Sequence, residues 1–113
     1  HGCHINGIGS YTPFMKEIDD ALVKRCEVLI DTKEALDVGD LSSLRNDDGS
    51  TKQNFSGLIG DALVGNIEFG KHRNNNFNCT FFKSVGTAIQ DVVTAQFVYE
   101  YARKEDIGSN FNM

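Results

Sequence analysis

Apolar residues occur in short runs along the chain, and three of these runs predict strands. The first extends from Cys3 to Ile8 and is closed by Gly7 and Gly9, as in a strand whose end allows another group to approach its backbone. Val28 to Ile30 is a continuous aliphatic run between two acidic residues, a pattern typical of a strand covered on both faces of a parallel sheet. A third strand is predicted from Asn78 to Phe82.

Helical spacing of apolar residues predicts two helices in the first third of the chain. Thr12 suits an N-cap and Pro13 the first helical position, so one helix is expected from about Pro13 to Arg25. A shorter helix is expected to start over Lys33 to Leu36 and to end at Gly39.

Two more helices are predicted in the second half, separated by polar connections. The first spans Phe55 to Leu63, where apolar residues recur every three or four positions, and the second runs from an N-cap at Ser84 to about Lys104. This last helix is apolar in nearly every direction, so we expect it to be buried on more than one side. The polar stretches Ser42–Gln53 and Lys71–Asn76 are expected to be loops.

The alternation of strands and helices predicts an α/β fold. We expect a partial Rossmann-like domain with about three parallel strands, crossover helices and a long C-terminal helix. Residues 1–113 leave room for one domain. The glycine-rich phosphate turn is absent, because Thr12 stands where its last glycine or alanine would be. The chain opens on His1 without an initiator Met, and we interpret it as a fragment of a longer protein.

Charge and cysteine content narrow the class of partner. A formal net charge of -5 and a pI near 5.0 argue against nucleic acid and anionic membranes as partners. No apolar run approaches the roughly 20 residues that span a bilayer. Cys3, Cys26 and Cys79 are too widely spaced to indicate a disulfide framework or a metal site, and Cys26 and Cys79 are expected in the core. These features predict a cytoplasmic protein that acts on a small molecule.

Two segments resemble the ornithine cyclodeaminase and mu-crystallin family. They are residues 2–13 (GCHINGIGSYTP) with residues 16–19, and residues 82–91 (FKSVGTAIQD). Between them, residues 28–31, 39–40 and 58–65 follow the order of the family. The resemblance implies that the chain is the C-terminal part of an NAD- or NADP-binding domain. It also implies a second domain, absent here, that binds an imino or amino acid substrate and forms a homodimer.

The resemblance also implies which residues meet the cofactor. It places the nicotinamide against the backbone of four residues, Gly7, Ile8, Gly9 and Ser10. It gives Ser84 a contact with the nicotinamide and Val85 a backbone position near the substrate. Ligands of open α/β sheets bind beyond the carboxyl ends of strands, and a helix N-terminus at Ser84 would offer free amides there. The alternatives are that the glycines only make a turn and that Ser84 is only a cap.

Tyr11 is the main departure from the family pattern. Ornithine cyclodeaminase has an aspartate there that acts on the substrate amine, and a tyrosine with an ordinary pKa of about 10 is not a carboxylate substitute at neutral pH. We therefore predict an NAD(P)-dependent reductase of an imine, with Tyr11 donating a hydrogen bond or a proton. Tyr11 as a mere rim residue is the alternative. The competing functions are ornithine cyclodeaminase and a non-catalytic mu-crystallin-like binding protein, and the isolated fragment is expected to be inactive.

The remaining polar residues of the first segment have simpler interpretations. His4 is expected to be a hydrogen-bonded core histidine and not a ligand. Glu17, Asp19 and Asp20 are expected to form a solvated helix face.

Overall fold

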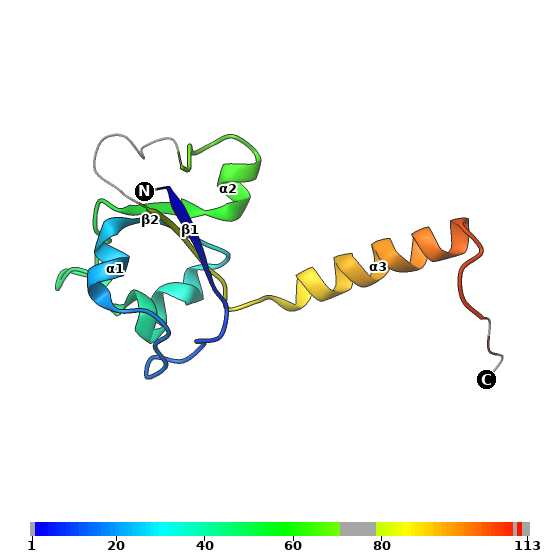
Figure 1. Cartoon of the computed structure of the whole chain (residues 1–113), viewed down its shortest axis with the longest axis horizontal. Helices are drawn as coiled ribbons and strands as arrows, with labels where there is room; N and C mark the ends of the chain where they lie inside the picture. Colours follow the sequence, from blue (N-terminus) through cyan, green and yellow to red (C-terminus); the bar gives the residue numbers. More distant parts are fainter. Residues whose placement is uncertain (1, 71–78, 110, 112–113) are drawn as a thin grey trace.

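The described part of the chain is built around a parallel sheet. The computed structural model describes residues 2–70, 79–109 and 111, so the predicted connection Lys71–Asn76 lies outside the described residues. The described strands form a four-stranded sheet in the order β1-β4-β2-β3, with every pair parallel (Figure 1). Their bounds are β1 Cys3–Gly7, β2 Cys26–Ile30, β3 Phe55–Leu58 and β4 Cys79–Lys83. The predicted α/β class, with parallel strands and crossover connections, is confirmed.

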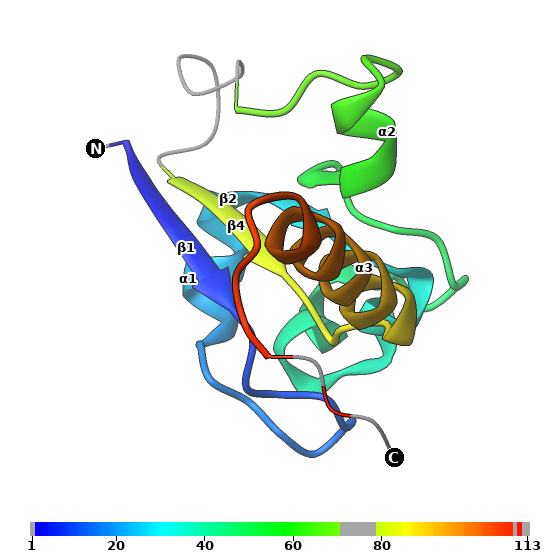
Figure 2. The same ribbon diagram turned by 90° about the vertical axis from the view of Figure 1, so that its right-hand side faces the viewer.

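One face of the sheet carries the main core. Val28, Ile30 and Phe81 point to this face and are fully buried, together with residues of helix α1 (Asp20–Arg25) and of a 3-10 segment, η2 (Gly39–Leu44). The opposite face carries α2 (Ile59–Leu63), and Figure 2 shows α1 and α2 on different sides of the strands. Both predicted core cysteines, Cys26 and Cys79, are buried.

The predicted helix from Pro13 to Arg25 is wrong in its first half. α1 begins only at Asp20, after an N-cap at Asp19 whose carboxylate accepts the amide of Leu22 at 2.7 Å. The preceding residues cannot continue the helix because the amides of Glu17 and Ile18 donate to the distant carboxylate of Asp40. A long-range contact therefore overrides the local pattern.

The predicted helix from Phe55 to Leu63 is a strand followed by a single helical turn. β3 pairs with β2, and α2 starts directly after it at Ile59. Over so short a run, apolar residues spaced three and four positions apart fit a half-buried strand as well as a helix. Pairing with β2 makes this segment a strand. Gly57 in this strand has φ +140°, a conformation that other residues rarely adopt.

The short helix predicted at Lys33 is present as a 3-10 segment, η1 (Lys33–Asp37). Gly39 does not end the helical region but starts η2, so the predicted loop begins later than expected. Leu41 and Leu44 of η2 are fully buried and belong to the core.

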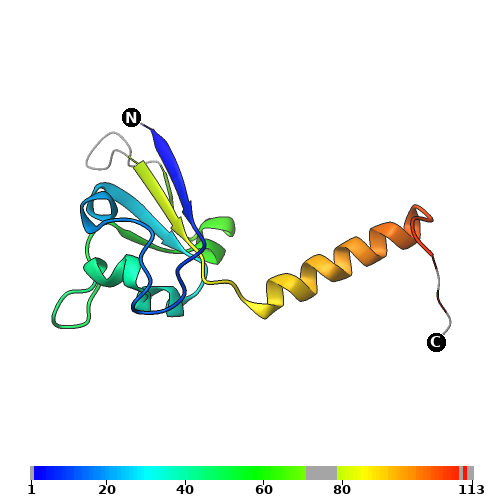
Figure 3. The same cartoon turned by 60° about the horizontal axis from the view of Figure 1, so that its bottom comes forward.

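The last helix, α3 (Ala88–Lys104), leaves the body of the molecule after β4, as Figures 1 and 3 both show. Its N-cap is Thr87, whereas the sequence predicted Ser84. The predicted burial of this helix is wrong for the described chain, in which no residue of α3 is buried and Phe97 is 68% exposed. Neither α3 nor any other described helix combines the length and the apolar content that a membrane crossing requires.

Candidate functional site

The residues singled out from the sequence meet at one edge of the sheet. β1, β4 and β2 are parallel neighbours, so the segments that follow Gly7, Lys83 and Ile30 emerge side by side. Two backbone hydrogen bonds join these segments: the Ser84 amide donates to the Gly7 carbonyl at 3.0 Å, and the Asp31 amide donates to the Lys83 carbonyl at 3.2 Å. This edge therefore brings together both motifs, which are more than 70 residues apart in the sequence.

The segment after β4 is held by the carboxylate of Asp31. One oxygen, Oδ2, accepts the Ser84 hydroxyl at 2.7 Å, the Val85 amide at 3.0 Å and the Gly86 amide at 2.8 Å. The other oxygen, Oδ1, accepts the Thr32 amide at 2.7 Å. We call this arrangement the Asp31 clamp. Ser84 does not cap α3: its hydroxyl donates to Asp31, its Oγ accepts the Gly86 amide at 3.2 Å, and the helix starts four residues later.

The segment after β1 is held by a second set of groups. One oxygen of Glu17, Oε2, accepts the amides of Gly9 and Ser10 at 2.8 and 3.2 Å. The Ser10 hydroxyl donates to Oδ2 of Asp40, whose other oxygen accepts the Glu17 amide at 2.6 Å and the Ile18 amide at 3.2 Å. Glu17 therefore anchors the turn between β1 and α1. The prediction that it belongs to a solvated helix face is wrong.

Lys83 completes this set from β4. Its ammonium group is fully buried and lies 3.3 Å from Asp40 Oδ2 and 3.7 Å from Glu17 Oε2. Burial would raise the pKa of Asp40, but donation by the Ser10 hydroxyl, by two backbone amides and by Lys83 outweighs it and lowers the pKa below its ordinary value. Asp40 is therefore ionised at neutral pH and pairs with the buried ammonium. We call Glu17, Asp40 and Lys83 the ionic anchor.

The glycines of the first motif are required by contacts inside the chain. A Cβ on Gly7 would lie 2.6 Å from the Phe81 ring, and a Cβ on Gly9 would collide with Oε1 of Glu17. Neither residue has a positive φ, so close approach and not backbone conformation demands glycine here.

Two side chains of the turn point outward. Ile8 is 59% exposed and Tyr11 is 67% exposed, whereas Ser10 between them is fully buried. Tyr11 makes no hydrogen bond to any residue that the structure describes, so its hydroxyl is free to meet a ligand.

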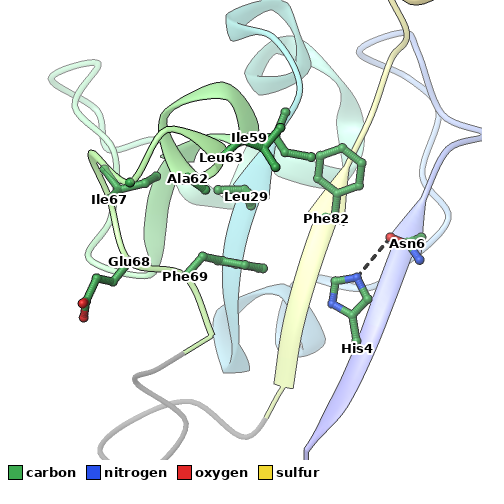
Figure 4. A pocket seen from close by; sticks show the side chains of 11 residues that line it. His4, Asn6, Leu29, Ile59, Ala62, Leu63, Ile67, Glu68, Phe69 and Phe82 are labelled. Carbon is green, nitrogen blue, oxygen red and sulfur yellow. Dashed lines mark hydrogen bonds between the residues drawn. The ribbon is translucent and has the colours of Figure 1, made fainter. Parts of the chain in front are cut away.

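An apolar cavity lies elsewhere on the sheet. It has a volume of about 750 Å³ and opens on the face of the sheet that carries α2 (Figure 4). Most of its lining is apolar, for example Leu29, Leu63 and Phe82, and none of the predicted site residues contributes to it. His4 at its rim bonds to Thr80 at 2.7 Å and to Asn6 at 3.1 Å.

His4 is therefore hydrogen-bonded as predicted, but it is exposed and not in the core. Within residues 2–70, 79–109 and 111, no group of three His, Cys, Asp or Glu side chains could hold a metal ion.

The sequence reasoning missed the residues that hold the two turns. Asp31 follows a buried strand, Asp40 follows a glycine that must be small, and Lys83 is a charged residue at the end of an otherwise buried strand. A charged residue at such a position is a usable signal, because buried charges need partners. Which partner each one takes depends on contacts across the fold and is not visible in the local pattern.

A parallel sheet with crossover helices and its two motif turns at the carboxyl edge defines an α/β domain of the Rossmann type. The family model described as "Ornithine cyclodeaminase/mu-crystallin family" matches residues 1–106. The chain belongs to this family, as the resemblance implied.

Individual relatives agree with this assignment. The chain is 34% identical to Delta(1)-pyrroline-2-carboxylate reductase of Bacillus cereus, over 96% of this chain and 33% of that protein. It is also similar to the structure of Thermococcus litoralis Delta(1)-pyrroline-2-carboxylate reductase in complex with NADH and L-proline, with a TM-score of 0.73 and 30% identity over 96% of this chain and 33% of that one.

An archaeal alanine dehydrogenase dimer with bound NAD gives a TM-score of 0.70 at 29% identity, over 97% of this chain and 34% of that one. The chain thus spans about a third of the length of the relatives that it matches.

Proposed function

We propose that this chain is the C-terminal part of the cofactor domain of an NAD- or NADP-dependent oxidoreductase that reduces an imine, either a ketimine or a cyclic imino acid. The observation that carries the proposal is the meeting of the two motif turns, around Gly9 and Ser84, at the carboxyl edge of the sheet. Support comes from the relative from Thermococcus litoralis, whose structure holds NADH and L-proline, because proline is the product of reducing pyrroline-2-carboxylate.

The groups at this edge fit the nicotinamide end of a dinucleotide better than its pyrophosphate. The amides of Gly9, Ser10, Val85 and Gly86 all donate to carboxylates of this chain and are not available to bind an anion. Two carboxylates, those of Glu17 and Asp31, lie at the edge and would repel phosphate. They suit an uncharged or positively charged ring instead.

Ser84 would meet the nicotinamide as a hydrogen-bond acceptor. Its proton points to Asp31 and its Oγ accepts the Gly86 amide at 3.2 Å, which leaves one lone pair of Oγ for an amide proton of a carboxamide. The exposed Ile8 offers the nicotinamide an apolar contact. The bound cofactor supplies the hydride that the imine carbon accepts.

We assign Tyr11 as the donor of the proton that the imine nitrogen takes up. A reduced imine needs a proton on nitrogen, and a tyrosine hydroxyl can donate one. A carboxylate at this position would be ionised instead and would suit ornithine cyclisation, so Tyr11 favours reduction over that reaction. Val85 lies on the adjacent turn and would border the substrate.

The complete protein would contain a further domain. A second domain, absent from these 113 residues, would bind the imino or amino acid and form a homodimer, and the protein would act in the cytoplasm.

The test is the loss of NADH and NADPH absorbance with pyrroline-2-carboxylate. The complete gene product that carries these residues is compared with the isolated chain 1–113. We expect oxidation by the complete protein alone. The proposed reaction would be refuted if the complete protein binds a dinucleotide but does not oxidise it when a ketimine or a cyclic imine is supplied. That result would favour ornithine cyclodeaminase or a binding protein.

A further inference from the structure

We propose that Glu17 is a positioning residue for the cofactor and that Lys83 and Asp40 hold it in place. This inference rests on the proposed function, since it assumes that the turn after β1 meets a nicotinamide. No side chain of the ionic anchor needs to touch the cofactor, because the anchor acts through the backbone of Gly9 and Ser10.

Few groups hold the backbone of the turn after β1. Gly7 and Gly9 lack side chains, so the backbone around Ile8 has unusual conformational freedom unless something fixes it. Within the described chain, the only acceptor for the amides of Gly9 and Ser10 is Oε2 of Glu17. The conformation that presents Ile8 and Tyr11 outward therefore depends on this oxygen atom, together with the bond from the Ser10 hydroxyl to Asp40.

Glu17 is itself held from two sides. Its own amide donates to Asp40 at 2.6 Å, which fixes the backbone, and the Lys83 ammonium lies 3.7 Å from the same Oε2 that binds the turn. Lys83 is fully buried and Asp40 is fully buried, whereas the side chain of Glu17 is 42% exposed. The buried pair thus forms a rigid support, and Glu17 transmits its position to the surface turn.

The carboxylate of Glu17 has two roles, as a hydrogen-bond acceptor and as a negative charge. Both amides bind Oε2, so a glutamine oxygen could replace it geometrically, with the amide nitrogen in the place of Oε1. That change would remove the attraction to Lys83 and leave the buried ammonium with Asp40 alone. Alanine would remove the acceptor as well. Glu17→Gln and Glu17→Ala therefore separate the charge of Glu17 from its hydrogen bonds.

A turn that is ordered before the cofactor arrives loses little conformational entropy on binding, whereas a released glycine-rich turn must be ordered at that moment. We expect the Kd for the dinucleotide to rise roughly 10-fold or more in Glu17→Ala and about 3-fold in Glu17→Gln, from the usual contribution of hydrogen bonds to a charged acceptor.

The experiment uses the complete gene product. Asp48→Asn is the matched control, because Asp48 also accepts an amide and a hydroxyl, both from Ser50, in an exposed turn far along the chain. Dinucleotide Kd is measured by NADH and NADPH fluorescence, and kcat and KM with pyrroline-2-carboxylate. Amide hydrogen exchange of a peptide that covers Gly7 to Thr12 is followed by mass spectrometry. The melting temperature reports general damage.

The expected result is a graded rise in Kd across the two Glu17 variants. Faster exchange of the peptide should accompany it, with a small change in melting temperature and no change in Asp48→Asn. Cofactor affinity equal to wild type in Glu17→Ala would overturn the inference. It would also be overturned if Asp48→Asn weakened binding as much as the Glu17 variants, since the effect would then be general.

The proposed function can fail separately. Graded loss of dinucleotide affinity in a protein that reduces no imine would support the role of Glu17 and refute the reductase. A wild-type protein that binds neither dinucleotide would refute both proposals.

Discussion

Replacing Asp31 should destabilise the protein by an amount that depends on which of its oxygens is kept. Oδ2 accepts three donors, from Ser84, Val85 and Gly86, and Oδ1 accepts one. Ser84 is only 9% exposed, so in Asp31→Ala its hydroxyl loses a charged acceptor that water replaces poorly, while the exposed Gly86 can turn to solvent. With about 1.5 kcal/mol each for the Ser84 and Val85 bonds, the loss is about 3 kcal/mol.

Asp31→Asn separates the two oxygens. The asparagine oxygen can occupy the place of Oδ2 and keep the three bonds in a weaker, uncharged form, so we expect a loss of about 1 kcal/mol. The assay is urea unfolding of the complete gene product, followed by circular dichroism. Asp37→Ala is the control: it breaks an exposed pair with Arg45 and should cost less than about 1 kcal/mol. Equal free energies of unfolding for Asp31→Ala and wild type would refute the clamp.

Three further predictions concern the core and the ionic anchor. Cys3 is exposed and should react with a thiol reagent in the native protein. Cys26 should react only after unfolding, because burial, together with the adjacent Cys79 thiol, raises the pKa of Cys26 to about 12. The pKa of Asp40 is lowered on folding from its ordinary value of 3.8, so its contribution to stability is present above that value and is lost as the pH falls through the folded pKa. Asp40→Asn should therefore unfold more easily at pH 7 and depend less on pH between 5 and 2, by circular dichroism; an unchanged acid transition would contradict this. Gly7→Ala should lower stability by about 1–3 kcal/mol in urea unfolding, since its Cβ would lie 2.6 Å from the Phe81 ring, and an unaltered midpoint would show that the ring can move aside.

The strands of the core could be predicted because their signal is local. Val28 to Ile30 lie in a strand buried along its whole length, and continuous aliphatic runs arise for that reason. β3 escaped prediction because Gly57 and its neighbours have a pattern that fits a helix equally well, and only pairing with β2 decides. The first helix was overestimated because Asp40, more than 20 residues further along the chain, takes the amides that a longer helix would use.

The candidate site was predictable as a set of motif residues but not as a structure. The resemblance identified Ser84, and parallel strand ends explained why it lies near Gly7. Ser84 does not cap α3 because the helix begins only after Thr87, and Ser84 is held instead by Asp31, 53 residues earlier. Hydrogen bonds between distant segments leave no periodic trace, so the groups that hold the turns in place could not be assigned to partners from the sequence.

The Asp31 clamp also has a mechanical consequence for α3. Within the described part of the chain, the segment from Ser84 to Thr87 joins the helix to the sheet, and the clamp fixes the start of that segment. At 1.5 Å per residue, the 17 residues of α3 form a rod of about 25 Å. A rotation of about 10° at its base would swing the far end by roughly 4 Å. The carboxylate of Asp31, which orients Ser84, thus also sets the direction of α3. A small rotation at the strand ends becomes a larger displacement at the far end of the helix.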